Sequence, residues 1–354
     1  MSEDLETYHA RPSPQTFFDH TPESLRELLQ TWAEPVYRVK QIVEWVYIHR
    51  ARSYDEMTNV PKKLRERLIA ELPLYTSAIR AQQESTDGTA KLLLQWADGA
   101  TSECVLIPDG DRRTVCISTQ VGCPVGCVFC ASGLNGLQRQ LSAGEIIEQA
   151  MRIGDLCEAS ARLSNVVFMG IGEPLANYDA TIRAVRTINA DWGMGIGARK
   201  ITVSTVGLPK PIRRLADEQL QITLALSLHA PTDEVRRAII PWAQRATIES
   251  LVEACQYYFD RTGREVTLEY ILLNGLNDAE QHARQLVKLA KAMRSNVNLI
   301  AYNPVKELSY RPSEPASVRR FLTVLRDKGI NVHLRPSRGG DIDAACGQLR
   351  RRVE

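Results

Sequence analysis

Three cysteines in one short stretch, Cys123, Cys127 and Cys130, are the residues whose spacing points most directly to chemistry. The spacing is C-x₃-C-x₂-C, and glycine and proline around it predict a loop in which three thiols converge on one metal centre. Ferredoxin sequences place a fourth cysteine nearby, whereas the next cysteine here is Cys157, inside an expected helix. Three thiolates around a four-iron cubane leave one iron without a protein ligand.

Such an open iron can bind a small molecule through an amine and a carboxylate. S-adenosylmethionine (SAM) carries both groups at one end, and an electron from the cluster can cleave its sulfonium bond to give a carbon radical, while the protein orients the reactants and excludes water. The alternative is zinc, which takes four Cys or His ligands at short spacing. Because no histidine lies between His49 and His229, zinc would need a distant fourth ligand, and the pattern favours the cluster.

Polar residues also follow several expected strands. Gly170, Gly172 and Glu173 follow one of them; the glycines permit close backbone approach, and a carboxylate or exposed carbonyl there can accept hydrogen bonds from an ammonium group. Each such strand end alone is typical of a turn or a cap, but several on the same side as the cysteine loop indicate a binding site. The other candidates are Ser204, Ser227, Leu228, His229 and Asn303.

The elements that must position these residues follow from hydrophobic periodicity. From about Lys91 the period is two, which predicts a hairpin with Asp98-Gly99 at its turn. Strand-like runs then alternate with helical ones, so the fold class expected is α/β, with a parallel sheet in a full or partial barrel and the chemistry at the carboxyl ends of the strands. The expected strands are 114–118, 165–169, 200–204, 222–227, 266–272, 298–302 and 330–335.

Residues 1 to about 80 are expected to be helical, with helices over 24–31, over 37–50 and from near Pro61. This segment is locally basic, and charge alone leaves open whether its surface is merely solvated or contacts RNA. Its basic residues include Arg38, Lys40, Arg50, Arg52, Lys62, Lys63, Arg65 and Arg67.

The composition excludes several classes of protein. The 354 residues carry 44 Lys and Arg against 42 Asp and Glu, a net charge of +2, and 44% are apolar, as in folded globular proteins. No apolar run reaches about 18 residues, and the acidic start MSEDLETYHA lacks the apolar region of a secretion signal, so we expect no membrane span and a cytoplasmic protein. Eight cysteines in such a chain favour metal binding or catalysis over disulfides.

The cysteines outside the loop fall into two groups. Cys157 and Cys255 lie in helical patterns and are expected to be inert core residues. Cys346 lies in a small-residue segment after the last strand, where a thiol near a barrel mouth can be a nucleophile. Cys116, on the first parallel strand, is placed to face the same cavity.

At these motifs the chain resembles the RlmN/Cfr family of radical SAM RNA methyltransferases, and most closely its RlmN branch. The resemblance covers about residues 20 to 350 and rests on the cysteine loop, Met169-Gly-Ile-Gly-Glu-Pro174, Ser227-Leu-His-Ala-Pro231 and Asp341-Ile-Asp-Ala-Ala-Cys-Gly-Gln-Leu349. It implies a partial (β/α)6-type radical SAM barrel with a small N-terminal helical domain and a connecting β-hairpin. The implied division is an RNA-binding accessory domain over 1–85, the hairpin over 86–108, the barrel over 109–342 and a catalytic cysteine loop and tail over 343–354.

The resemblance also implies cofactors and roles. Cys123, Cys127 and Cys130 would hold a [4Fe-4S] cluster, and SAM would contact Gly172, Glu173, Ser204, Ser227, Leu228, His229 and Asn303. One SAM would methylate Cys346, and a second would give the radical that removes a hydrogen from this S-methyl group. The resulting carbon would add to C2 of an adenosine, with Glu103 as proton acceptor and Cys116 as the thiol that releases the product.

The implied substrates are an adenosine in 23S rRNA and one beside the tRNA anticodon, with an external one-electron donor such as flavodoxin or ferredoxin, and the protein is expected to be a monomer. Two alternatives remain at this point. A Cfr-like enzyme would methylate C8 of the 23S rRNA adenosine, and Pro174 and Ala230 favour C2 over C8. A non-catalytic RNA-binding protein with structural zinc would leave Cys116 and Cys346 without a role.

Overall fold

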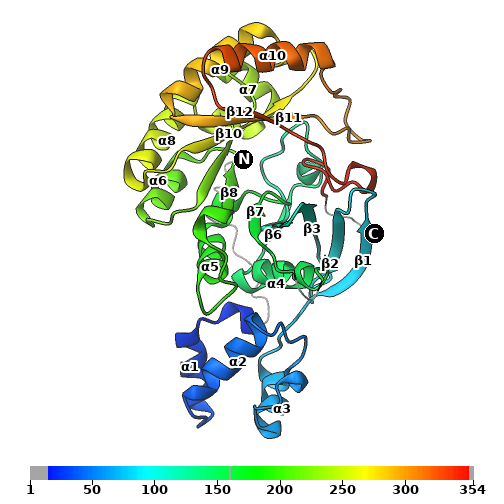
Figure 1. The fold of residues 1–354 in the computed structure, drawn as a ribbon, viewed down its shortest axis with the longest axis vertical. Helices are drawn as coiled ribbons and strands as arrows, with labels where there is room; N and C mark the ends of the chain where they lie inside the picture. Colours follow the sequence, from blue (N-terminus) through cyan, green and yellow to red (C-terminus); the bar gives the residue numbers. More distant parts are fainter. Residues whose placement is uncertain (1–14, 159–160, 351–354) are drawn as a thin grey trace.

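A computed structural model describes residues 15–158 and 161–350, so the acidic start of the chain and the last residues of its tail lie outside the described part. Three helices form a small domain at the N-terminal end (Figure 1). They are α1 (Pro22–Thr31), α2 (Tyr37–Tyr47) and α3 (Lys62–Glu71). Thr21 caps α1, accepting a hydrogen bond from Ser24 N at 3.3 Å, and Pro22 occupies the first turn, where no amide donor is needed.

The rest of the described chain is built on a ten-stranded sheet in the order β1-β2-β3-β4-β7-β8-β9-β10-β11-β12. Its first four strands are antiparallel, and those from β4 to β12 are parallel. The strands are β1 (Ala78–Glu84), β2 (Ala90–Gln95), β3 (Thr101–Asp109), β4 (Arg112–Cys116), β7 (Asn165–Phe168), β8 (Ile201–Thr205), β9 (Thr223–Ser227), β10 (Val266–Leu272), β11 (Ser295–Ala301) and β12 (Val332–Arg335).

Helices cross from one parallel strand to the next, as parallel pairing requires. Helix α4 begins after Ser142, whose side chain forms the expected capping box with Glu145. The helices pack on the outside of the curved sheet (Figure 1), and α4 and α5 lie between the barrel and the N-terminal domain. The helices are α4 (Ala143–Gly154), α5 (Tyr178–Asn189), α6 (Pro209–Asp217), α7 (Asp233–Ile239), α8 (Ile248–Thr262), α9 (Glu280–Ala292) and α10 (Pro315–Asp327).

The curved sheet is open, because β1 and β12 are its two edges. The segment after β12 crosses from one edge towards the other and lies beside β1 and β2 (Figure 1). Gly339 N donates to Asp87 at 3.0 Å, and Ser85 donates to Asp341 at 2.6 Å. The C-terminal segment therefore closes part of the opening that the strands leave.

The expected α/β class and partial barrel are confirmed, including all seven parallel strands and the hairpin. Two expectations were wrong in detail. Residues 78–84 were expected in the helical segment, but they form β1, which pairs with β2 along its length. β1 is a mostly polar edge strand, so its sequence lacks the apolar alternation that predicts a strand, and its partner supplies the apolar side chains. Cys157 lies beyond the end of α4 and is only half-buried. No described helix is long and apolar enough to cross a membrane.

Candidate active site

The cysteine loop is held at its base by a small two-stranded sheet that the sequence did not predict. β5 (Gln120–Gly122) precedes the loop, and β6 (Leu137–Gln140) follows it. Gly122 has φ +79°, and a Cβ there would collide with the Gly136 carbonyl. Cys123 N donates to that carbonyl at 3.1 Å, so backbone bonds fix where the loop begins and ends.

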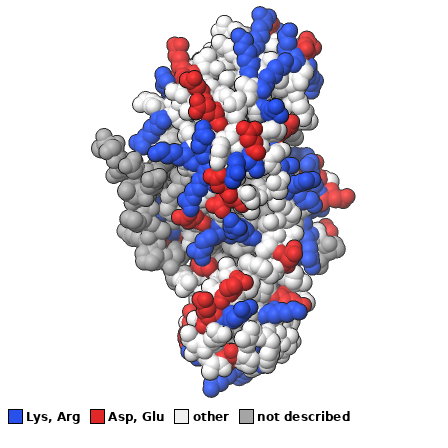
Figure 2. Space-filling model, turned by 90° about the vertical axis from the view of Figure 1, so that its left-hand side faces the viewer, with Lys and Arg blue, Asp and Glu red and all other residues white. Residues whose placement is uncertain are grey.

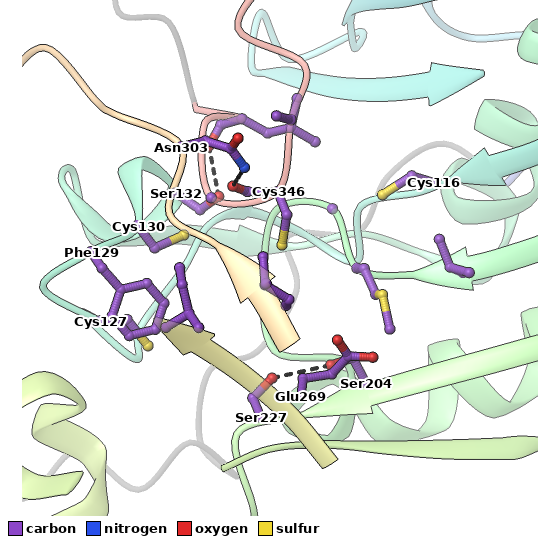
Figure 3. A pocket seen from close by; sticks show the side chains of 18 of the residues that line it. Cys116, Cys127, Phe129, Cys130, Ser132, Ser204, Ser227, Glu269, Asn303 and Cys346 are labelled. Carbon is purple, nitrogen blue, oxygen red and sulfur yellow. Dashed lines mark hydrogen bonds between the residues drawn. The ribbon is translucent and has the colours of Figure 1, made fainter. Parts of the chain in front are cut away.

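Cys123, Cys127 and Cys130 all line one cavity at the carboxyl ends of the strands. Cys127 and Cys130 are labelled in Figure 3. Burial raises the pKa of the Cys123 thiol to about 12 and raises the pKa values of the other two. Among the described residues, no three Cys, His, Asp or Glu side chains already converge around a single metal ion. A cubane cluster does not need such convergence, because each of its thiolates binds a different iron.

A buried cation lies beside this loop. Arg236, on α7, is fully buried; its Nε donates to Leu228 O at 3.2 Å, and its Nη2 donates to Val206 O. Its Nη1 is buried without a hydrogen-bond partner, and its charge acts on Cys127. An unpaired buried guanidinium nitrogen is costly, so the site fits an anionic, thiolate-bound group that would compensate this charge.

Most of the strand-end residues expected to contact SAM line the same cavity, namely Gly172, Glu173, Ser204, Ser227, His229 and Asn303. Leu228 differs: it is fully buried and does not line the cavity, and its backbone bonds to Arg236 and to Glu269 O. The hydroxyls of Ser204 and Ser227, on neighbouring strands, lie 3.3 Å apart (Figure 3). They therefore form a polar edge to an otherwise largely apolar wall.

Glu173 has a structural task in this site. Its two carboxylate oxygens accept hydrogen bonds from Leu175 N at 3.0 Å and from Val206 N at 2.7 Å. Burial raises its pKa to about 7, against the effect of these bonds. Gly172 has φ +112°, and a Cβ there would lie 2.7 Å from the Cβ of Gln120. The side chain of Glu173 thus holds neighbouring loops together.

His229 is held in an uncommon backbone conformation with φ +57°. Its Nδ1 accepts a hydrogen bond from Ile271 N at 3.1 Å, which leaves the proton on Nε2. Burial, with a contribution from Arg236, lowers its pKa to about 3, so the ring is neutral. Asn277 supports this conformation by donating to His229 O at 2.7 Å. His229 therefore offers a fixed hydrogen-bond donor rather than a charge.

Cys346 and Cys116 line the same cavity as the cluster cysteines, although 230 residues separate them in sequence (346 − 116). Cys346 enters from the C-terminal loop and Cys116 from the end of β4 (Figure 3). Both are free thiols. Burial raises the pKa of Cys116 to about 12. Cys346 is exposed, and desolvation by the groups around its thiol raises its pKa to about 11. The charge of Arg335 lowers the pKa of both thiols against these effects.

Glu103 lies at a different place. It is buried on β3 and does not line the cavity, and its carboxylate contacts Lys91 Nζ at 3.2 Å and Arg350 N at 2.9 Å. Glu103 is nevertheless close to the cavity wall. Val105, two residues after it on β3, pairs with Cys116, which lines the cavity. The structure thus puts Glu103 behind the C-terminal loop and not in the open site.

Several cavity residues escaped the sequence analysis. Glu269, on β10, is buried, accepts a hydrogen bond from Asn298 at 3.0 Å and pairs with Arg335 at 3.4 Å. The sequence could have pointed to Glu269, because it stands within the apolar run Val-Thr-Leu-Glu-Tyr-Ile-Leu. A carboxylate buried in such a strand needs a partner. No sequence signal marks Arg335 or Arg236, which only the packing brings to the site.

The basic residues of the N-terminal domain make many contacts within the protein. Arg67 pairs with Glu71 at 2.8 Å, Arg65 donates to Asp55 O at 2.5 Å, and Arg50 donates to Gly154 O at 3.0 Å. On the face seen in Figure 2, basic and acidic side chains are interspersed.

Comparison with known proteins identifies the family. The Radical SAM superfamily profile matches residues 117–287, and that of the ribosomal RNA large subunit methyltransferase N-terminal domain matches residues 16–72. The chain is 45% identical to a probable dual-specificity RNA methyltransferase RlmN of Rhodopirellula baltica, over 93% of this chain and 89% of that protein. It is 47% identical to the Thermosynechococcus vestitus protein of the same description, over 91% and 95%.

A solved structure agrees over nearly the whole chain. The crystal structure of a radical SAM methyltransferase from Sphaerobacter thermophilus matches with a TM-score of 0.93 and 44% identity, covering 95% of this chain and 99% of that one. A radical SAM protein of this kind uses a [4Fe-4S] cluster and SAM, and the cavity described above has the thiols for the first and the strand ends for the second. The chain therefore belongs to the RlmN family of radical SAM dual-specificity RNA methyltransferases.

Proposed function

We propose that this protein methylates C2 of an adenosine in 23S rRNA and of the adenosine next to the anticodon in tRNA, using two SAM per turnover and S-methylated Cys346 as the methyl carrier. The observation that carries the proposal is that Cys346 and Cys116 line one cavity with the three cysteines of the loop. Neither a structural zinc site nor an ordinary methyltransferase needs two further thiols in that place.

The chemistry explains why a carrier thiol is needed. C2 of adenine lies between two ring nitrogens and offers no electron pair to an electrophilic methyl group. When bound, the cluster and SAM supply a transferable methyl group and a one-electron route to a carbon radical. Cys346 as thiolate accepts the methyl group by displacement. The radical that the second SAM would supply takes a hydrogen atom from this methyl group and leaves a carbon radical on Cys346. That carbon adds to C2 and links RNA to protein.

Release of the product needs a proton acceptor and a second thiol. The adduct would pass its unpaired electron back to the cluster, which balances the one supplied at the start, and the C2 proton passes to Glu103. The thiolate of Cys116 then attacks the Cys346 sulfur: an S–S bond forms, the C–S bond breaks, and its electron pair stays on the carbon, which takes a proton and becomes the methyl group. An external dithiol then reduces the disulfide for the next turnover.

Membership of the family also suggests roles for the domains, an electron donor and an oligomeric state. We assign RNA binding to the accessory domain over 1–85, with the hairpin over 86–108 as its connection to the barrel over 109–342, and catalysis at Cys346 to the loop and tail over 343–354. An unstacked adenosine in a loop can reach such a cavity at lower cost than one in a duplex. We further propose a monomer that works in the cytoplasm, with flavodoxin or ferredoxin as electron donor.

The test is mass spectrometry of nucleosides from 23S rRNA fragments and tRNA treated with the anaerobically reconstituted full chain. The proposal predicts 2-methyladenosine in both RNAs and none with Cys346→Ala. Cys157→Ala is the matched control, since this cysteine lies outside the cavity, and it should retain activity. Formation of 8-methyladenosine alone would instead establish the C8 reaction.

A further inference from the structure

Lys91, on β2, is a buried lysine that the proposed chemistry does not yet use. Its side chain is 2% exposed, and its Nζ lies 3.2 Å from the carboxylate of Glu103, which is 1% exposed. The same Nζ donates a hydrogen bond of 3.1 Å to the backbone carbonyl of Asp343, in the C-terminal loop. Lys91 therefore joins the candidate proton acceptor to the loop that carries Cys346.

The second oxygen of Glu103 contacts the other end of that loop, accepting a hydrogen bond from Arg350 N at 2.9 Å. The Lys91–Glu103 pair thus holds the loop at Asp343 and at Arg350, and Cys346 lies between these two anchors. The pair also borders the second thiol, because Glu103 stands two residues from Val105, the partner of Cys116 in the sheet. Two residues apart on a strand means the same face of the sheet.

A buried ion pair is a costly way to fill space. Well-packed apolar side chains of similar volume stabilise a core as well or better, whereas removal of one partner leaves an uncompensated buried charge. Loss of the Lys91 side chain would remove both the cation beside the Glu103 carboxylate and the bond that ties this pair to Asp343 of the Cys346 loop. The position of Lys91 is therefore explained better by the proposed role of Glu103 as proton acceptor than by a contribution to stability.

We propose that Lys91 is a positioning residue for product release: it holds the Glu103 carboxylate behind the Cys346 loop, so that Glu103 accepts the proton of C2 when its bond to Arg350 N opens. This inference rests on the proposed function. In the step concerned, the C2–H bond breaks, its electron pair stays with the ring, and the proton goes to a Glu103 oxygen, while Lys91 keeps its own protons. Glu103 gives up the Arg350 N–H bond as it does so, which loosens one end of the loop when the product must leave.

The test uses the full chain, anaerobically reconstituted, with SAM, dithionite and a 23S rRNA fragment. Three quantities are measured: deoxyadenosine formed per cluster, covalent protein–RNA adduct on denaturing gels, and 2-methyladenosine released. Lys91→Met should form deoxyadenosine as the wild type does but accumulate adduct several-fold and release product at least about tenfold more slowly. Lys91→Arg should restore release, because it keeps the cation. Lys91→Gln replaces the methionine variant if that variant does not fold.

Ser85→Ala is the matched control for loop anchoring, because Ser85 holds Asp341 of the same segment without touching Glu103. It should not accumulate adduct. The inference is overturned if Lys91→Met clears adduct at the wild-type rate, or if Ser85→Ala accumulates as much adduct as Lys91→Met. A wild-type protein that makes no methylated adenosine would overturn the proposed function itself, so the two failures are distinct.

Discussion

Ala131 N donates a hydrogen bond of 2.8 Å to Gly347 O. The donor follows Cys130 directly, and the acceptor follows Cys346, so one backbone bond joins the cysteine loop to the loop that carries the candidate methyl carrier. Ser132 adds a second bond, from its hydroxyl to Leu349 O at 2.6 Å. Together they restrain the separation between the cysteine loop and the Cys346 loop, and the hydrogen-atom transfer that we propose would require this separation to be short.

Ser132→Ala should loosen this connection without removing a cluster ligand. A hydrogen bond of this kind contributes about 1 kcal/mol, so we expect faster amide exchange over residues 344–350 and up to about a fivefold slower single turnover. Iron content should stay at the wild-type level. Hydrogen–deuterium exchange and iron analysis measure this, with Ser250→Ala on α8 as a control. Unchanged exchange in Ser132→Ala would show that the bond does not restrain the loop.

Methylation of Cys346 should depend strongly on pH. The thiolate is the nucleophile, and desolvation by the groups around the Cys346 thiol raises its pKa to about 11. Below that pKa the thiolate fraction rises about tenfold per pH unit, so transfer of the first methyl group should accelerate from pH 7 to pH 9. Mass spectrometry of the protein after incubation with SAM, at each pH, gives the rate.

Arg335 should shift this profile. Its charge lowers the pKa of Cys346 against the effect of desolvation. Loss of this charge in Arg335→Met should therefore move the profile to higher pH and slow methyl transfer at pH 8. Arg335→Lys keeps a cation and is the control. A profile that is the same in all three proteins would mean that this guanidinium does not act on the thiol.

Cys116→Ala should trap the covalent intermediate. Without a second thiol the Cys346 sulfur cannot be attacked, so a protein–RNA adduct should accumulate towards one per protein while 2-methyladenosine falls to background. Denaturing gels with labelled RNA measure the adduct. Cys255→Ala, in the core of α8, provides a cysteine control. Normal turnover by Cys116→Ala would contradict the two-thiol scheme.

Gly172→Ala should weaken SAM binding more than an equivalent change elsewhere. The added methyl group would meet Gln120 at 2.7 Å in a backbone conformation of φ +112°, a strain of about 1 to 3 kcal/mol. Gly195→Ala also replaces a glycine with positive φ, +64°, but meets nothing within 4 Å. Equilibrium binding of SAM to the reconstituted variants should show a roughly tenfold or larger loss for Gly172→Ala only. Equal losses of SAM affinity in the two variants would show that the effect comes from general loop destabilisation and not from the Gly172 site.

The sequence alone determined the repeating architecture and the identity of the reactive groups. Periods of two and 3.6 in the apolar residues record which face of each element is buried, so the seven parallel strands and α4 could be predicted from local pattern. The three loop cysteines lie close together in the sequence, so the cysteine loop could also be predicted. The strand β1 was missed because its polar residues pair through backbone atoms, which leave no apolar pattern.

The tertiary structure decided what surrounds those groups. In the folded chain Glu103 contacts Lys91 and Arg350 behind the C-terminal loop, and the carboxylate of Glu173 accepts hydrogen bonds from two backbone amides. Arg335 lines the cavity, and Arg236 lies close enough to Cys127 to act on its thiol. Hydrogen bonds and charge compensation of this kind join residues far apart in the chain. No periodicity encodes them, because they depend on which buried polar atoms the completed fold brings within about 3 Å of one another.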